Sequence, residues 1–109
     1  MNAVIVLTTV TSDFDARPLA RELVEQRLAA CVDILPAVTS FYRWKETITE
    51  DSEQIVIIKT IDDNLHDLRE ALFARHPYEV PEFVVLPVAS MSDAYGAWLL
   101  ESSNRRENK

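Results

Sequence analysis

The segment 76–82, His-Pro-Tyr-Glu-Val-Pro-Glu, constrains the fold of this chain more than any other. Pro77 has no amide proton and disfavours helical angles at His76, so a preceding helix must end at or before His76. Pro81 restricts Val80 in the same way and suits the first position of a strand. The segment is therefore predicted to be a stiff connector between a helix and a strand. The pattern itself favours equally a turn that serves geometry alone and a connector that holds polar side chains in place.

Apolar residues in the rest of the chain follow strand spacing in some stretches and helix spacing in others. Strands are predicted at 3–10, 31–44, 54–60 and 81–88, with a bend at Pro36 on an edge of the sheet. A short helix is predicted from Ser92. The two longer helices are expected to be capped by Asp13 or Asp15 and by Asp62 or Asp63. Apolar positions recur at helical spacing in both: Leu19, Leu23 and either Val24 or Leu28 in the first, and Leu65, Leu68, Leu72 and Phe73 on one face of the second.

This order predicts an α+β fold, a ferredoxin-like βαββαβ antiparallel sheet with two helices on one face. The polar stretch 45–52 is expected to connect a β-hairpin that extends beyond the sheet as an arm, and a short C-terminal helix follows the last strand. Residues 1–109 are expected to form a single domain, with 102–109 as a frayed tail.

Composition excludes several classes of function. The net charge of −7 and the pI near 4.7 argue against nucleic-acid binding, which needs a basic surface. The single glycine, Gly96, cannot build a phosphate-binding loop or a Gly-x-Ser-x-Gly nucleophile turn. No apolar run is long enough to span a membrane, and the first apolar run lacks the flanks of a signal peptide. The lone Cys31 fits a reducing compartment, so a cytoplasmic location is expected.

Few side chains could hold a metal ion. Cys31, His66 and His76 are the soft ligands of the chain, too few for a structural zinc site in one subunit. Cys31 follows Leu-Ala-Ala, which is typical of a buried, unreactive thiol, and His66 is expected to be a solvated helix residue. His76, on the stiff connector, is the plausible ligand, for weak binding of copper or another divalent cation. The alternative is that its ring only ends the helix through a hydrogen bond to backbone.

A polar cleft is predicted where the connector meets the sheet edge. Its expected residues are Lys59, Tyr78, Glu79 and Glu82, with Tyr42 or Trp44 from the arm. Surface charge with a weak ion pair is the alternative. Two carboxylates without a nucleophile or an oxyanion site are a weak indication of catalysis, so no enzyme is predicted.

Several segments together resemble the CutA family of divalent-cation tolerance proteins. The matching residues are 27–32, Tyr42, Trp44, 57–60, 76–82, Tyr95 and Trp98. The resemblance implies a ferredoxin-like fold assembled as a homotrimer, similar in architecture to the PII signalling proteins. It also implies a role in tolerance of divalent metals such as copper, without an established catalytic activity or a tightly bound cofactor.

The resemblance is incomplete at the metal positions. Some members that bind copper have a cysteine at the end of the first strand and a His-His pair before the proline; here Thr8 and Arg75 replace the cysteine and the first histidine. A hydroxyl and a guanidinium do not replace a thiolate and an imidazole on copper. The family's usual glycine after the hairpin tryptophan is Glu46 here. Two classes stay open: a trimer that binds divalent metal weakly, and a PII-like signalling or adaptor trimer that binds a small molecule between subunits or a protein partner.

Overall fold

The computed structural model describes residues 1–105. Its elements are, in order, β1 (Ala3–Thr11), α1 (Arg17–Glu25), β2 (Cys31–Trp44), β3 (Thr47–Ile61), the 3-10 helix η1 (Asp62–Asn64), α2 (Leu65–Phe73), β4 (Val84–Pro87) and α3 (Asp93–Ser103). The strands form one antiparallel sheet in the order β2-β3-β1-β4. The predicted ferredoxin-like α+β fold is confirmed. Among the helices of residues 1–105, none combines the length and the hydropathy that crossing a membrane requires.

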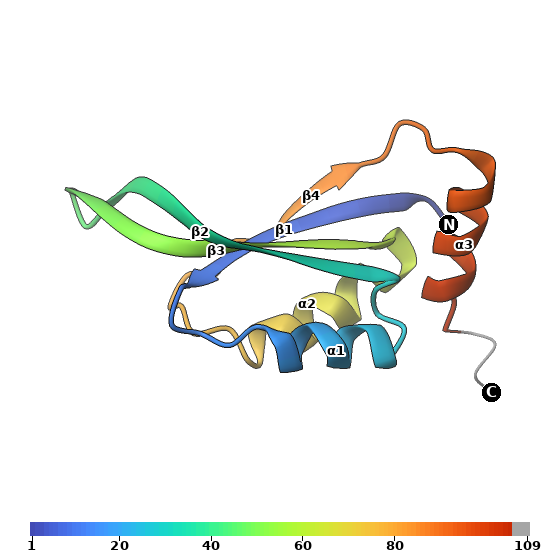
Figure 1. Ribbon diagram of the computed structural model, residues 1–109, viewed down its shortest axis with the longest axis horizontal. Coiled ribbons are helices and arrows are strands. Elements are labelled where there is room, and N and C mark those ends of the chain that lie inside the picture. Colours follow the sequence, from blue (N-terminus) through green and yellow to red (C-terminus); the bar gives the residue numbers. More distant parts are fainter. Residues whose placement is uncertain (106–109) are drawn as a thin grey trace.

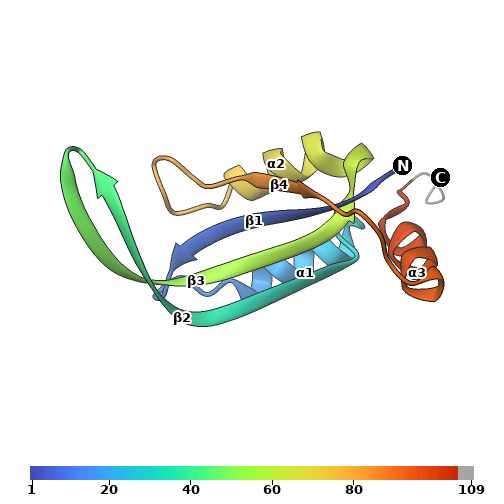
Figure 2. The same ribbon diagram turned by 90° about the horizontal axis from the view of Figure 1, so that it is seen from above.

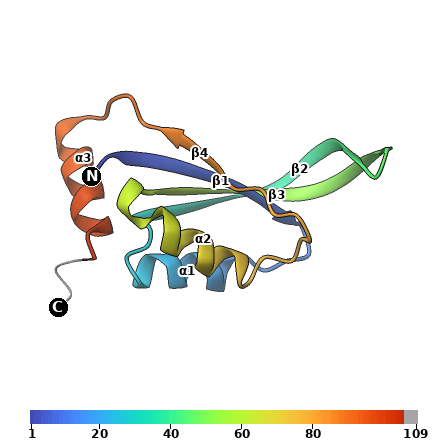
Figure 3. The same cartoon turned by 180° about the vertical axis from the view of Figure 1, so that it is seen from behind.

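The helices α1 and α2 lie side by side on one face of the sheet, and α3 stands at the end of the sheet away from the arm (Figures 1 and 3). Alternate residues of β1 point into the core beneath the sheet, which is the periodicity expected of a strand with one buried face. The core between the sheet and the two helices includes Val6, Val10, Val56, Ile58, Leu19, Leu23, Leu68 and Leu72. Burial of this apolar face is the main source of stability for the two short helices.

The opposite face of the sheet has no helix over it (Figure 1). The intervening residues of β1 and β3, such as Ile5, Leu7 and Ile57, are half-buried on this open face. The residues of β4 at the sheet edge are all exposed. Apolar side chains on an uncovered face and edge are typical of a surface that another molecule covers.

Strands β2 and β3 continue past the helices as a hairpin arm, which Figure 2 shows from above. The register shifts between Leu35 and Val38, so the bend predicted at Pro36 on a sheet edge is confirmed. The prediction that 45–52 is a loop is wrong. Only Lys45 and Glu46 form the turn, and Thr47 already pairs with Trp44. Residues 47–52 of β3 have no buried face in this chain, so they are mostly polar and lack the apolar alternation that marks a strand in sequence.

The helix boundaries differ from the predicted ones in their caps. Ala16 and Asn64 occupy the N-cap positions of α1 and α2, and neither helix has a side-chain cap. Asp15 instead accepts a hydrogen bond from the backbone amide of Arg17, while Asp62 begins the 3-10 turn η1. Of the alternatives for α1, Leu28 is buried, although it follows the helix, and Val24 is exposed.

Two predicted boundaries near the C-terminal end of the described residues are wrong. β4 begins at Val84 and not at Pro81, because the connector ahead of it does not pair with β1. α3 continues through Ser103, whose side chain is fully buried and whose carbonyl accepts a hydrogen bond from Asn64. The chain is therefore ordered past Ser102, where the frayed tail was expected to begin. The last part of that predicted tail, 106–109, lies outside the described residues.

Candidate functional site

A cavity of about 680 Å³ opens between the hairpin arm and the connector 76–82. We call it the arm cavity. Residues from four segments line it: Thr9 of β1; Ser40, Phe41, Tyr42 and Trp44 of β2; Glu53 of β3; and Pro77, Tyr78, Glu79, Val80, Pro81 and Glu82 of the connector. Its volume lies within the roughly 300–1,000 Å³ that is usual for small-molecule sites.

The structure brings together five of the six residues expected in a cleft, since Tyr42, Trp44, Tyr78, Glu79 and Glu82 all line the arm cavity. The sixth, Lys59, does not line it. At about 3.3 Å per strand residue, Lys59 lies roughly 20 Å along β3 from the cavity wall.

Lys59 makes a local ion pair instead. Its Nζ atom is 3.1 Å from Oδ2 of Asp33, and this hydrogen bond is the largest cause of a pKa raised above the usual lysine value. The same residues lie beside Cys31, whose Sγ is 3.7 Å from Oδ1 of Asp33. Burial, followed by the charge of Asp33, raises the pKa of the half-buried Cys31, so the thiol stays protonated near neutral pH.

Glu53 is a cavity residue that sequence reasoning missed. Its side chain is on the open face of the sheet, and the residue is only 5 % exposed. The hydroxyl of Tyr78 donates a hydrogen bond to its carboxylate. Burial, followed by this hydrogen bond, raises the pKa of Tyr78, so the phenol stays protonated and continues to donate. A signal lies in the sequence: Glu53 continues the alternation of Ile55 and Ile57, so a carboxylate shares the open face of β3 with apolar side chains.

Glu82 is half-buried in the cavity wall near Glu53. Burial raises the pKa of Glu82, and the negative charge of Glu53 raises it further. Within residues 1–105, no hydrogen bond or ion pair engages the carboxylate of Glu82. The cavity therefore contains two neighbouring carboxylates, of which Tyr78 compensates one.

His76 is the first residue of the connector, and both nitrogens of its ring take part in hydrogen bonds. Nδ1 accepts a hydrogen bond from the backbone amide of Tyr78 at 3.1 Å, which leaves the proton on Nε2, 3.1 Å from the hydroxyl of Thr8. Burial is the main reason that the pKa of His76 is below its usual value, so the ring is neutral at neutral pH. The stiff connector thus depends on His76 for its attachment to β1.

Thr8 and Arg75 stand where some copper-binding members of the family that the sequence resembles have a cysteine and a histidine. Both residues serve structural roles here. Thr8 is fully buried and bonded to His76. Nη2 of Arg75 pairs with Oε1 of Glu22 at 2.5 Å, which ties the end of α2 to α1. Within residues 1–105, no group of three or more His, Cys, Asp or Glu side chains could hold a metal ion.

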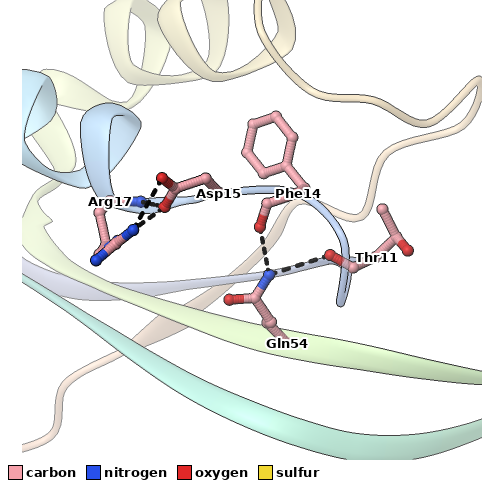
Figure 4. Close-up of polar contacts among 5 residues, drawn as sticks. All are labelled: Thr11, Phe14, Asp15, Arg17 and Gln54. Carbon is pink, nitrogen blue, oxygen red and sulfur yellow. Dashed lines mark hydrogen bonds and ion pairs between the residues drawn. The ribbon is translucent and has the colours of Figure 1, made fainter.

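Gln54 of β3 holds the loop between β1 and α1 through its side-chain amide (Figure 4). The side-chain amide of Gln54 donates to the carbonyl of Thr11 at 3.0 Å and to that of Phe14 at 2.7 Å. Asp15 and Arg17 form a second, exposed pair in the same loop. The two bonds of Gln54 attach this loop to β3 at the position next to Glu53.

Comparisons with known proteins agree on one family. The family model described as CutA1 divalent ion tolerance protein matches residues 4–102. The chain is 46% identical over 99 residues to "Divalent-cation tolerance protein CutA" of Thermus thermophilus, covering 91% of this chain and 96% of that protein. It is 40% identical over 101 residues to "Protein CutA, chloroplastic" of Arabidopsis thaliana, covering 93% of this chain and 56% of that longer protein. A solved structure of the divalent cation tolerance protein from Thermus thermophilus superposes with a TM-score of 0.88 at 45% identity, over 94% of this chain and 99% of that one.

Proposed function

Because the chain belongs to the CutA1 divalent ion tolerance family, we propose that it acts as a homotrimer in the cellular response to divalent metal ions, copper among them. The printed names of its relatives, divalent-cation tolerance proteins, support the role in metal tolerance. We assign the protein to the cytoplasm on the basis of its single cysteine. We assign it no catalytic activity: among the described residues, the side-chain hydroxyl that is hydrogen-bonded to a histidine is that of Thr8, which is fully buried and out of reach of a substrate.

Trimer formation is supported by the apolar surface that one chain leaves uncovered. Phe41, Trp44 and Ile48 of the arm are exposed, as are the residues of β4 at the opposite edge of the sheet. Pairing of an arm with the edge of a neighbouring chain, repeated under closed cyclic symmetry, would cover much of this surface. Sedimentation equilibrium is expected to give three times the 12.4 kDa mass of the chain, and a monomer at micromolar concentration would contradict the proposal.

Metal binding is proposed to be weak and to depend on His76. The observation that carries this is the neutral ring of His76, whose Nε2 already contacts Thr8. A neutral imidazole is a suitable copper ligand, but Nε2 carries the ring proton and the lone pair of Nδ1 accepts from the Tyr78 amide, so an ion must displace one of the two. The described residues include no group of three or more His, Cys, Asp or Glu side chains that would hold the ion tightly.

Copper titration of the wild type, His76→Ala and the control His66→Ala tests this proposal. Weak binding that only His76→Ala abolishes is the expected result. Equal binding by all three proteins would remove His76 from the site, and tight binding by the wild type would show that the loss of the cysteine and histidine at Thr8 and Arg75 matters little.

A PII-like role, in which the trimer signals by binding a small molecule between subunits, is the second candidate. The arm cavity favours it, because the cavity is of ligand size and an arm that docks on a neighbour would carry one wall of it to the interface. A calorimetric screen of metabolites against the trimer tests this role, and it fails if no compound binds.

A further inference from the structure

The charged residues that line the arm cavity all have the same sign. Glu53, Glu79 and Glu82 contribute three carboxylates, and none of the lining residues is a lysine, arginine or histidine. Glu53 is almost completely buried, and Glu82 is half-buried beside it. Bringing two carboxylates out of water next to each other is unfavourable unless a positive charge or a proton compensates them.

Apart from Thr9 and Ser40, the rest of the wall is aromatic and apolar. Phe41, Tyr42, Trp44 and Tyr78 line the cavity together with two prolines and a valine. Aromatic faces attract organic cations, which lose little hydration on leaving water. The ring of Trp44 already has an ammonium group near it, since Nζ of Lys45 lies 5.7 Å from the ring centroid. Lys45 itself does not line the cavity, so the space inside is left without a positive charge.

We propose that the arm cavity binds a small organic cation, an ammonium or guanidinium group on an apolar frame. The charged group lies between Glu53 and Glu82, and the frame lies against the rings of Tyr42 and Trp44. This proposal deepens the second function proposed above, because it names the chemical class of the small molecule.

Two other ligand classes fit the lining less well. A nucleotide or another phosphate would meet three carboxylates and no basic side chain, although phosphate sites are built from arginine, lysine and glycine-rich backbone. A bare divalent ion needs several converging oxygen ligands, and the described residues include no such cluster.

Three probes that share one frame separate charge from shape. We expect 2-phenylethylamine to bind the purified trimer at near-neutral pH, measured by calorimetry and by the shift of the Trp44 indole N–H signal. The uncharged analogue 2-phenylethanol is expected to bind at least roughly tenfold more weakly, because it forms no charge-assisted hydrogen bond. The anion 3-phenylpropionate is expected not to bind. A blocked tripeptide with a central lysine, titrated in parallel, shows whether the cation is better supplied by a free amine or by a peptide side chain.

Matched variants test which carboxylate of the cavity binds the charged group of the ligand. Glu82→Gln is expected to weaken binding of the amine by roughly tenfold or more, while Glu70→Gln, the same change at an exposed position of α2, leaves it unaltered. Glu79→Gln, at an exposed position of the connector, gives a second cavity variant that cannot disturb the core.

The outcomes separate this proposal from the function on which it rests. Equal binding of amine and alcohol, or equal effects of Glu82→Gln and Glu70→Gln, would contradict the proposal that the ligand is a cation. Binding of the anion alone would contradict the proposed cationic ligand, while the proposed small-molecule function would stand. If the probes and the metabolite screen all failed to bind, both proposals would fall.

Discussion

Tyr78 keeps a nearly buried carboxylate compensated. Its hydroxyl donates to Glu53, which is 5 % exposed, so Tyr78→Phe leaves that carboxylate without a protein donor. We expect the free energy of unfolding to fall by about 1–3 kcal/mol, the usual cost of a buried polar group left unsatisfied. Urea unfolding measures the change. The control is Tyr95→Phe, which removes a hydroxyl from an exposed ring of α3 and is expected to change stability little. Equal losses in both variants would contradict the role of Glu53.

His76 makes stability depend on pH. Burial lowers its pKa below the ordinary value of 6.5, so in acid the unfolded chain binds a proton that the folded chain takes up less readily. The free energy of unfolding is therefore highest above pH 6.5 and falls as the pH decreases through 6.5 towards the lower pKa of the folded state.

The measurement is the melting temperature from about pH 7.5 to about pH 5.5 in the wild type, His76→Gln and the exposed-site control His66→Gln. The decrease is expected to be smaller in His76→Gln only. Glu82, whose pKa is raised by burial and then by Glu53, acts in the opposite direction in all three proteins, since its folded form takes up a proton at a higher pH. Parallel curves for wild type and His76→Gln would show that another group is responsible.

The sequence predicted most of the candidate site because the two prolines fix where the connector residues lie. Tyr78, Glu79 and Glu82 follow from the connector, and Tyr42 and Trp44 from the arm. Lys59 lies outside the cavity because β3 begins at Thr47 and not at 54, so its Glu53 part, and not its Lys59 end, meets the connector. Which end of a long strand meets a connector depends on register, which a local pattern does not specify.

At the scale of elements, the turn of the arm is strained. Lys45 and Glu46 have φ values of 50° and 67°, in the left-handed region that two-residue hairpin turns require and glycine or asparagine adopts most easily. Glu46→Gly is expected to raise the free energy of unfolding by about 0.5–1 kcal/mol, because it relieves that strain. Thermal and urea unfolding check the gain. Glu50→Gly, on β3 of the same hairpin, is the matched control and should destabilise.

Element type was easier to predict than element length. Strands and helices with a buried face, such as β1 and α2, are predicted from the spacing of their apolar residues. The outer part of β3 and the ends of the short β4 are not, because residues 47–52 bury neither face and the length of β4 depends on how far it follows β1. Both are decided by contacts across the sheet, which lie outside any local window.

At the scale of the whole molecule, β4 is the element of the proposed trimer where an introduced charge is expected to disturb assembly most. Leu86 is 43% exposed at the sheet edge, and burial of a lysine there against a neighbouring chain would cost several kcal/mol. Leu86→Lys is therefore expected to sediment as a monomer. Val24→Lys, at a position of α1 that is 41% exposed, is the matched control and should remain a trimer. Dissociation of both variants, or of neither, would place the interface elsewhere.

The strand order also determines when, during translation, each strand can pair with its neighbours in the sheet. β1 lies between β3 and β4, with Ala3 paired to Ile61 and Val4 to Pro87. A ribosome therefore makes β1 long before it makes the second neighbour of β1, and the growing chain holds an open edge for most of its translation. A chain ending at Phe83, just before β4, would keep that edge open. We expect such a chain to be cut by protease in or near β1 at concentrations that leave the longer chain intact.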